Sequence, residues 1–149
     1  MTRLHEQIQT ALPIEESFAF VADFANSMHW DPGVESSERL DEGPVGLGAR
    51  YRLGVRMNGR VVPMEYRITS FDAPHRVVLT GEGSGVSAVD EILFDALPEG
   101  TKVDYTADIK LHGVLGIIQP LLGRAFAKVA SDALSGMRRA LDERAMAPR

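Results

Sequence analysis

The sequence predicts an α+β domain, and three observations carry that prediction. Short strands separated by turn signals follow one another between residues 34 and 111. A long amphipathic helix is predicted behind them, over residues 116–145. The chain has 149 residues, which suits a single domain over 1–149, because domains usually contain about 100–150 residues.

The N-terminal part predicts one strand and two short helices. Alternation around Leu4, Ile8 and Leu12 indicates a strand over residues 4–12. Pro13 followed by two glutamates favours a helix start, because proline and acidic side chains suit a first helical turn. A second short helix or turn is expected over residues 26–30.

The hairpin turns predict a register for the six strands that follow. The strongest turn is Asn58-Gly59, which pairs Tyr51 with Tyr66 on one face and Arg52 with Glu65 on the other. The same inner face then receives these pairs: Val55 with Val62, Leu53 with Met64, Ile68 with Leu79, Ser70 with Val77, Gly81 with Ala88, Leu79 with Asp90, Val77 with Ile92, Phe94 with Tyr105, Ile92 with Ala107 and Asp90 with Ile109. All of these pairs fall on the same face of the sheet. This agreement matters because a slip of one residue in any hairpin would turn the side chains of a strand to the opposite face.

The long helix is the element expected to cover the apolar face of the sheet. Its apolar stripe consists of Ile118, Leu122, Ala125, Phe126, Val129, Ala133, Met137 and Leu141. Small side chains on this stripe leave room between helix and sheet. The sequence therefore predicts an apolar cavity, the usual form of a small-molecule site.

The order of these elements resembles a known superfamily. The matching stretches are PIEESFAFVADF at 13–24, WDPGV at 30–34, GLGAR at 46–50, YRITSFDAPHRV at 66–77 and EGTKV at 99–103. They resemble the helix-grip fold of the START, polyketide cyclase/dehydrase and birch-pollen-allergen-like (SRPBCC) superfamily. The resemblance implies a seven-stranded curved antiparallel sheet wrapped around a long C-terminal helix, with two short helices after the first strand. It also implies a hydrophobic ligand cavity and, for some members, aromatic polyketide cyclisation or dehydration.

Asp90 is the first candidate for chemistry, because the register places its carboxyl on the cavity face. A buried carboxyl has a raised pKa and can serve as a general acid or base. Tyr66 is its candidate catalytic partner. One alternative is a register slipped by one residue, which would turn Glu91 inward instead. A second is that Asp90 pairs with a hydroxyl group or lies at the mouth of the cavity.

The expected ligand-binding residues share the inner face of the sheet, the loop after the short helices or the helix stripe. They are Trp30, Tyr51, Leu53, Met64, Tyr66, Leu79, Asp90, Ile92, Tyr105, Leu122, Phe126, Val129 and Ala133. Weaker candidates are His29, His112, Gln119 and Asp132.

Composition excludes several classes of function. The chain has no cysteine, which rules out thiol chemistry and cysteine metal sites. Its net charge of -5 argues against a nucleic-acid partner. The four histidines lack metal-ligand spacing, so we expect neither a metal nor another cofactor. The apolar stretch 113–122 is too short for stable membrane insertion, and a cytoplasmic protein is expected. The oligomeric state stays open, with a homodimer as one option.

Three functions fit these observations. The first is binding of a small hydrophobic ligand, aromatic, polyketide or lipid-like. The second is a polyketide cyclase or dehydratase in which a cavity carboxylate and tyrosines transfer protons. The third is a protein-interaction or co-chaperone module.

Overall fold

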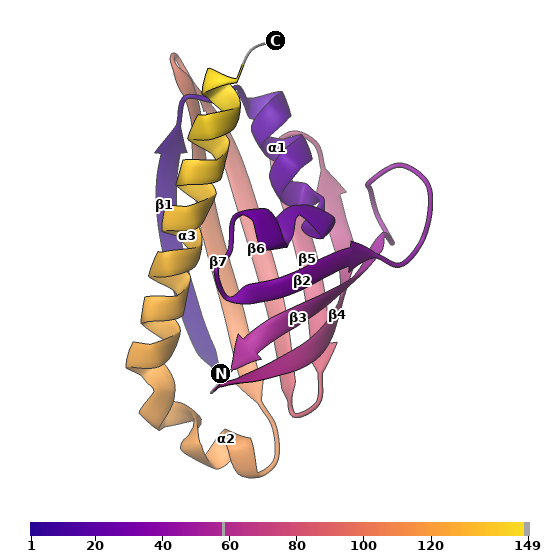
Figure 1. Ribbon diagram of the computed structural model, residues 1–149, viewed down its shortest axis with the longest axis vertical. Coiled ribbons are helices and arrows are strands. Elements are labelled where there is room, and N and C mark those ends of the chain that lie inside the picture. Colours follow the sequence, from indigo (N-terminus) through magenta and orange to yellow (C-terminus); the bar gives the residue numbers. More distant parts are fainter. Residues whose placement is uncertain (58, 148–149) are drawn as a thin grey trace.

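The structure is a computed structural model that describes residues 1–57 and 59–147. Its elements are β1 (Thr2–Thr10), α1 (Ile14–Ala22), the 3-10 helix η1 (Phe24–His29), β2 (Val34–Arg39), β3 (Arg50–Met57), β4 (Arg60–Asp72), β5 (Arg76–Gly83), β6 (Val86–Leu97), β7 (Gly100–Leu111), α2 (Val114–Ile118), the 3-10 helix η2 (Gln119–Leu122) and α3 (Gly123–Met146). The strands form one antiparallel sheet in the order β1-β7-β6-β5-β4-β3-β2. In Figure 1 the sheet curls, α3 runs along β1, and α1 and α2 lie at opposite ends of the molecule. This is the helix-grip fold that the sequence predicts.

Strict alternation along the strands produces the inner face. In β6, for example, Val86, Ala88, Asp90, Ile92 and Phe94 are all buried, while the residues between them are more exposed. Because side chains alternate between faces with period two, this pattern commits one whole face to the interior. Glu91 therefore lies on the outer face, and the alternative register that turned it inward is wrong.

Most of the predicted pairings are present. Tyr51 pairs with Tyr66, Ile68 with Leu79 and Leu79 with Asp90. Met57 pairs with Arg60 on either side of the predicted Asn58-Gly59 turn, although Asn58 itself lies outside the described residues.

Two of the hairpins differ from the predicted register. The register shifts between Ile68 and Ser70, so Ser70 pairs with Val78 and not with Val77. Such an irregularity adds one residue to one strand, which turn signals do not reveal.

The last hairpin is tighter than predicted. Leu97 pairs with Gly100, which leaves a two-residue turn and moves every pair along by two: Phe94 with Val103, Ile92 with Tyr105, and Asp90 with Ala107. Gly100 adopts a φ of 151°, and a Cβ there would lie 1.8 Å from the Thr10 carbonyl oxygen. Glycine therefore permits the short turn, and the even shift keeps every side chain on its predicted face.

The predicted helix over 116–145 is interrupted. It begins as α2, tightens into η2 around Pro120, and continues as α3. Gln119 explains where the break lies, because its side chain turns back to the sheet. Its Oε1 accepts from the Leu111 N–H at 3.0 Å, and its Nε2 donates to the Ile109 carbonyl at 2.7 Å. Gln119 therefore ties the start of the helical segment to the end of β7.

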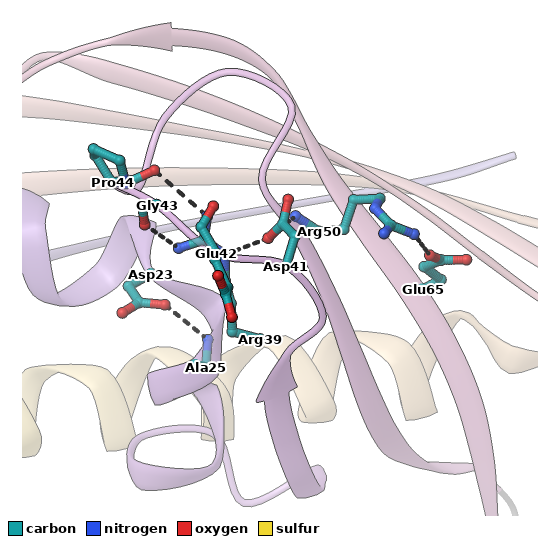
Figure 2. Close-up of polar contacts among 9 residues, drawn as sticks. All are labelled: Asp23, Ala25, Arg39, Asp41, Glu42, Gly43, Pro44, Arg50 and Glu65. Carbon is teal, nitrogen blue, oxygen red and sulfur yellow. Dashed lines mark hydrogen bonds and ion pairs between the residues drawn. The ribbon is translucent and has the colours of Figure 1, made fainter.

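The loop between β2 and β3 is held by one arginine (Figure 2). Arg39 Nε donates to Asp41 Oδ1 at 2.5 Å, and its terminal nitrogens donate to the carbonyls of Gly43, Glu42 and Pro44. The guanidinium also lies 5.6 Å from the centre of the Tyr51 ring. Arg39 therefore fixes the loop and also covers the ring of Tyr51, which is completely buried.

The end of the sheet next to α1 is filled by aromatic side chains. The Phe18 ring meets the edges of Phe71 and Phe94 at centroid distances of 5.3 and 5.1 Å. Edge-to-face packing of this kind leaves little free volume.

Candidate functional site

Two adjoining spaces lie between the sheet and α3. The inner chamber has a volume of about 140 Å³, and the outer groove near α2 has about 640 Å³. Both are bounded by Val55, Tyr66, Ala88, Ile109 and Val129, so the two spaces adjoin. The volume of the groove alone falls within the 300–1,000 Å³ typical of small-molecule pockets.

The inner chamber lies among β1, β3, β4, β6, β7, η1 and α3. Its lining residues are Leu4, Glu6, Phe24, Ser27, Trp30, Asp31, Val34, Leu53, Val55, Tyr66, Ala88, Asp90, Tyr105, Ala107, Ile109, Val129, Ala130, Ala133 and Leu134. The lining is mostly apolar and aromatic, with a few polar groups.

Asp90 and Tyr105 form the central polar pair of the inner chamber. The Tyr105 hydroxyl donates to Asp90 Oδ2 at 2.5 Å, from the neighbouring strand. Burial raises the pKa of Asp90 to about 7, against the opposing effect of this hydrogen bond. Burial also raises the pKa of Tyr105 well above its ordinary value, so Tyr105 stays a hydrogen-bond donor. A carboxyl that titrates near neutrality can give or take a proton at physiological pH.

Aromatic rings surround this pair. The Trp30 ring lies 6.2 Å from Tyr105 at an interplanar angle of 62°, and Phe24 lies 5.3 Å from Tyr66. Tyr66 is buried, and its hydroxyl contacts Met64 Sδ at 4.0 Å. Tyr105, and not the expected Tyr66, is therefore the tyrosine that holds Asp90.

Two further polar groups in the chamber have no protein partner. Ser27 Oγ and Trp30 Nε1 are buried without a hydrogen bond in the described part of the chain. Two more carboxylates, Glu6 and Asp31, line the same space. Burial raises the pKa of Asp31, whose Oδ1 accepts from the Gly33 N–H at 2.8 Å.

The outer groove is apolar and open at its mouth. It is bounded by the ends of β3–β7, by α2 and by the first half of α3, including Met64, Leu111, Leu115, Leu122, Ala125, Phe126 and the cationic Arg56 and Arg60. The neighbouring Val114, Ile117 and Leu121 are strongly exposed.

The segment Val114–Met146 is long and apolar enough to cross a membrane, judged by length and composition alone. Its apolar window has a mean hydropathy of 1.2, and 6% of that window is buried. The break at η2 divides this segment, and the second half of α3 packs on the sheet through Ala133, Leu134, Met137 and Leu141.

Ten of the thirteen expected ligand-binding residues line the two spaces. They are Trp30, Leu53, Met64, Tyr66, Asp90, Tyr105, Leu122, Phe126, Val129 and Ala133. Tyr51, Leu79 and Ile92 are completely buried, and none of the three is among the described residues that line the chamber or the groove. Their faces were predicted correctly, but neighbouring side chains cover them; Tyr51, for instance, lies under Phe24 and Arg39.

Three of the weaker candidate residues make contacts elsewhere in the protein. Gln119 bonds to β7, His112 contacts Ser87 Oγ at 3.0 Å on the surface, and Asp132 pairs with Lys128. Within residues 1–57 and 59–147 no three His, Asp or Glu side chains gather in a way that could hold a metal ion.

Sequence reasoning missed Glu6, Ser27 and Asp31. Glu6 shares the alternation of Leu4 and Ile8, which was a usable signal for its inward direction. Ser27 and Asp31 lie in η1 and the turn after it, where no simple period tells which side chains point inward. Their place in the chamber depends on how η1 packs against β2.

Solved structures with this architecture come from several bacteria. A START superfamily protein from Mycobacterium smegmatis matches with 18% identity and a TM-score of 0.73, over 96% of each chain. A protein from Thermus thermophilus matches with 21% identity and a TM-score of 0.75, over 97% of each chain. The Zhui aromatase/cyclase from a Streptomyces species matches with 16% identity and a TM-score of 0.75, over 97% of this chain and 93% of that one.

At these identities the likeness extends to the fold alone. A comparison with curated proteins found no match. The family model for polyketide cyclase/dehydrase and lipid transport proteins matches residues 1–142. Nearly the whole chain, with its curled sheet, C-terminal helix and intervening cavity, therefore belongs to the polyketide cyclase/dehydrase and lipid transport family.

Proposed function

We propose that this protein binds a small hydrophobic molecule, aromatic, polyketide or lipid-like, in the inner chamber and outer groove. The observation that carries the proposal is the pair of adjoining, mainly apolar spaces between the sheet and α3. Burying apolar ligand surface stabilises a complex by roughly 25 cal/mol per Å² before the costs of binding. The few polar groups at the inner end are suited to orienting such a ligand.

The helix offers a matched pair of variants to test this. Ala133 lines the inner chamber, and Ala133→Leu would fill part of its volume. Ala127 is exposed on the same helix, so Ala127→Leu adds the same atoms outside the cavity. The neutral dye N-phenyl-1-naphthylamine serves as the probe, because its fluorescence rises in an apolar site.

We expect saturable one-to-one binding of the dye to the wild type and to Ala127→Leu. Ala133→Leu should weaken binding at least about tenfold, since it removes volume that the ligand would occupy. Absence of binding by the folded wild type, or equal binding by both variants, would overturn the proposal. Native mass spectrometry of the purified protein would identify a ligand that co-purifies.

We infer proton transfer on a carbonyl substrate, as in polyketide cyclisation or dehydration, as a second candidate function. The specific observation in its favour is the buried Asp90–Tyr105 pair. Ionised Asp90 would remove a proton from carbon next to a carbonyl, and a tyrosine hydroxyl would donate a hydrogen bond to the enolate oxygen.

This candidate is tested with 2-tetralone as a probe in deuterated water. Exchange of its α-protons, followed by proton NMR, should be faster with the wild type than without protein and should rise between pH 6 and 8. Asp90→Asn should abolish the acceleration while retaining dye binding. A rate unchanged by Asp90→Asn would remove the catalytic role and leave a binding protein.

A further inference from the structure

We propose that the inner chamber recognises a hydroxyl group, so that the ligand is a neutral hydrophobic alcohol or phenol whose oxygen lies beside Asp90 and Trp30. This inference rests on the proposed function and deepens it by naming the group at the buried end of the ligand. A hydroxyl both donates one hydrogen bond and accepts others, and the chamber offers partners of both kinds.

The carboxylates of the chamber can accept hydrogen bonds, so they favour a ligand with a hydrogen-bond donor. Glu6, Asp31 and Asp90 line it, and none of its lining residues is a lysine, arginine or histidine. Tyr105 occupies Oδ2 of Asp90, and no residue in the described ranges donates to Oδ1. Asp90 is 7% exposed, and a donor on the ligand would replace water at this oxygen.

The indole N–H of Trp30 favours a ligand with a hydrogen-bond acceptor. Its Nε1–H can only donate, and it is buried without a partner, as is the hydroxyl of Ser27. Trp30 is 5% exposed and its ring packs against Tyr105, the residue that binds Asp90. The unsatisfied donor and the carboxylate acceptor thus belong to one contiguous group of side chains.

Two other kinds of headgroup meet only one of the two requirements, a donor for Asp90 and an acceptor for Trp30. An ether or ketone oxygen accepts from Trp30 but gives nothing to Asp90. A protonated amine donates to the carboxylates but leaves the Trp30 indole unpaired. A hydroxyl is the smallest group that meets both requirements, and buried polar groups left unpaired weaken binding considerably.

Three probes of similar length separate these headgroups: 1-decanol, 1-methoxynonane and decylamine. Trp30 is the only tryptophan of the chain, so its fluorescence reports on the chamber itself. At pH 8 we expect 1-decanol to bind at least about tenfold more tightly than 1-methoxynonane, the effect of one hydrogen bond to a charged group. Decylamine should bind more weakly than 1-decanol.

Two leucine variants on adjacent residues provide the control. Asp90→Leu should abolish the preference for the alcohol over the ether, whereas Glu91→Leu, on the outer face, should keep it. Equal affinity for alcohol and ether in the wild type, tighter binding of the amine, or a preference that survives Asp90→Leu would each overturn the inference.

The proposed function has its own readout in the same samples. Binding of N-phenyl-1-naphthylamine without discrimination between alcohol and ether would leave the hydrophobic site standing and reject hydroxyl recognition. If neither the dye nor any of the three probes binds, the proposed function itself fails.

Discussion

The inner chamber and the outer groove adjoin and have opposite character. Among the described residues, the inner chamber carries three carboxylates and no basic side chain, and the outer groove carries Arg56 and Arg60 and no acidic one. The inner end is covered by the well-packed half of α3, whereas the groove lies beside the exposed residues of α2. The contrast indicates that the inner end can orient a ligand, while the groove can hold apolar ligand chains of different lengths.

The largest expected effect concerns the charge at the inner end. Asp90 has a folded pKa of about 7, above its ordinary value of 3.8, because of burial. The folded state therefore keeps a proton that the unfolded state loses, and stability falls as the pH rises from about 4 to about 7. Relative to Asp90→Asn, the wild type should lose up to about 4 kcal/mol of unfolding free energy over this window.

Urea unfolding of both proteins at several pH values measures this difference. Parallel stability curves for the wild type and Asp90→Asn would show that Asp90 ionises as an ordinary carboxyl. The inner end would then lack the carboxyl with a raised pKa that distinguishes it from the groove.

The next effect separates the two parts of the C-terminal helical segment. Met137 is fully buried against the sheet, and Leu121, near the groove, is 83% exposed. Met137→Ala should cost about 3 kcal/mol, because it removes buried atoms and leaves a cavity. Leu121→Ala should change the unfolding free energy by less than about 0.5 kcal/mol. Similar losses would mean that η2 is covered in solution.

A smaller effect is expected where α3 approaches the loop after η1. A Cβ on Gly136 would lie 2.0 Å from the Trp30 carbonyl oxygen, so the backbones touch there. Gly136→Ala should cost about 2 kcal/mol and shift the Trp30 emission, although alanine normally favours a helix over glycine.

Gly123 in the same helix provides the control. No atom lies within 4 Å of a Cβ added there, so Gly123→Ala should be neutral or stabilise by up to about 1 kcal/mol. Thermal unfolding measures the change in stability of the two variants, and tryptophan emission reports on the surroundings of Trp30. A neutral Gly136→Ala with unchanged emission would contradict the close approach that encloses the chamber.

The face of each strand residue was predictable, but the extent of the cavity along that face was not. Alternation placed Asp90, Tyr66 and Tyr105 inward even though the last hairpin was two residues out of register, since an even shift preserves the face. Leu79 and Ile92 share the inner face and still lie in solid core. Where the packing ends and the free space begins depends on side chains from η1 and α1, which strand periodicity does not describe.

The irregular segments were the least predictable and hold much of the site. Ser27, Trp30 and Asp31 come from η1 and the turn after it, and only Trp30 was expected at the cavity. Pro120 was visible in the sequence, but the reason for the break at η2 is the long-range bonding of Gln119 to β7. Tertiary contacts of this kind have no local sequence signal.

The most direct test of the account is the indole N–H signal of Trp30. A ¹H–¹⁵N NMR spectrum of this chain contains one such signal, because Trp30 is its only tryptophan. Saturation with 1-decanol should move that signal downfield, as expected when Nε1–H gains a hydrogen-bond acceptor, and Ala133→Leu should prevent the shift. An indole signal that stays in place while 1-decanol binds would contradict hydroxyl recognition at the inner end of the cavity.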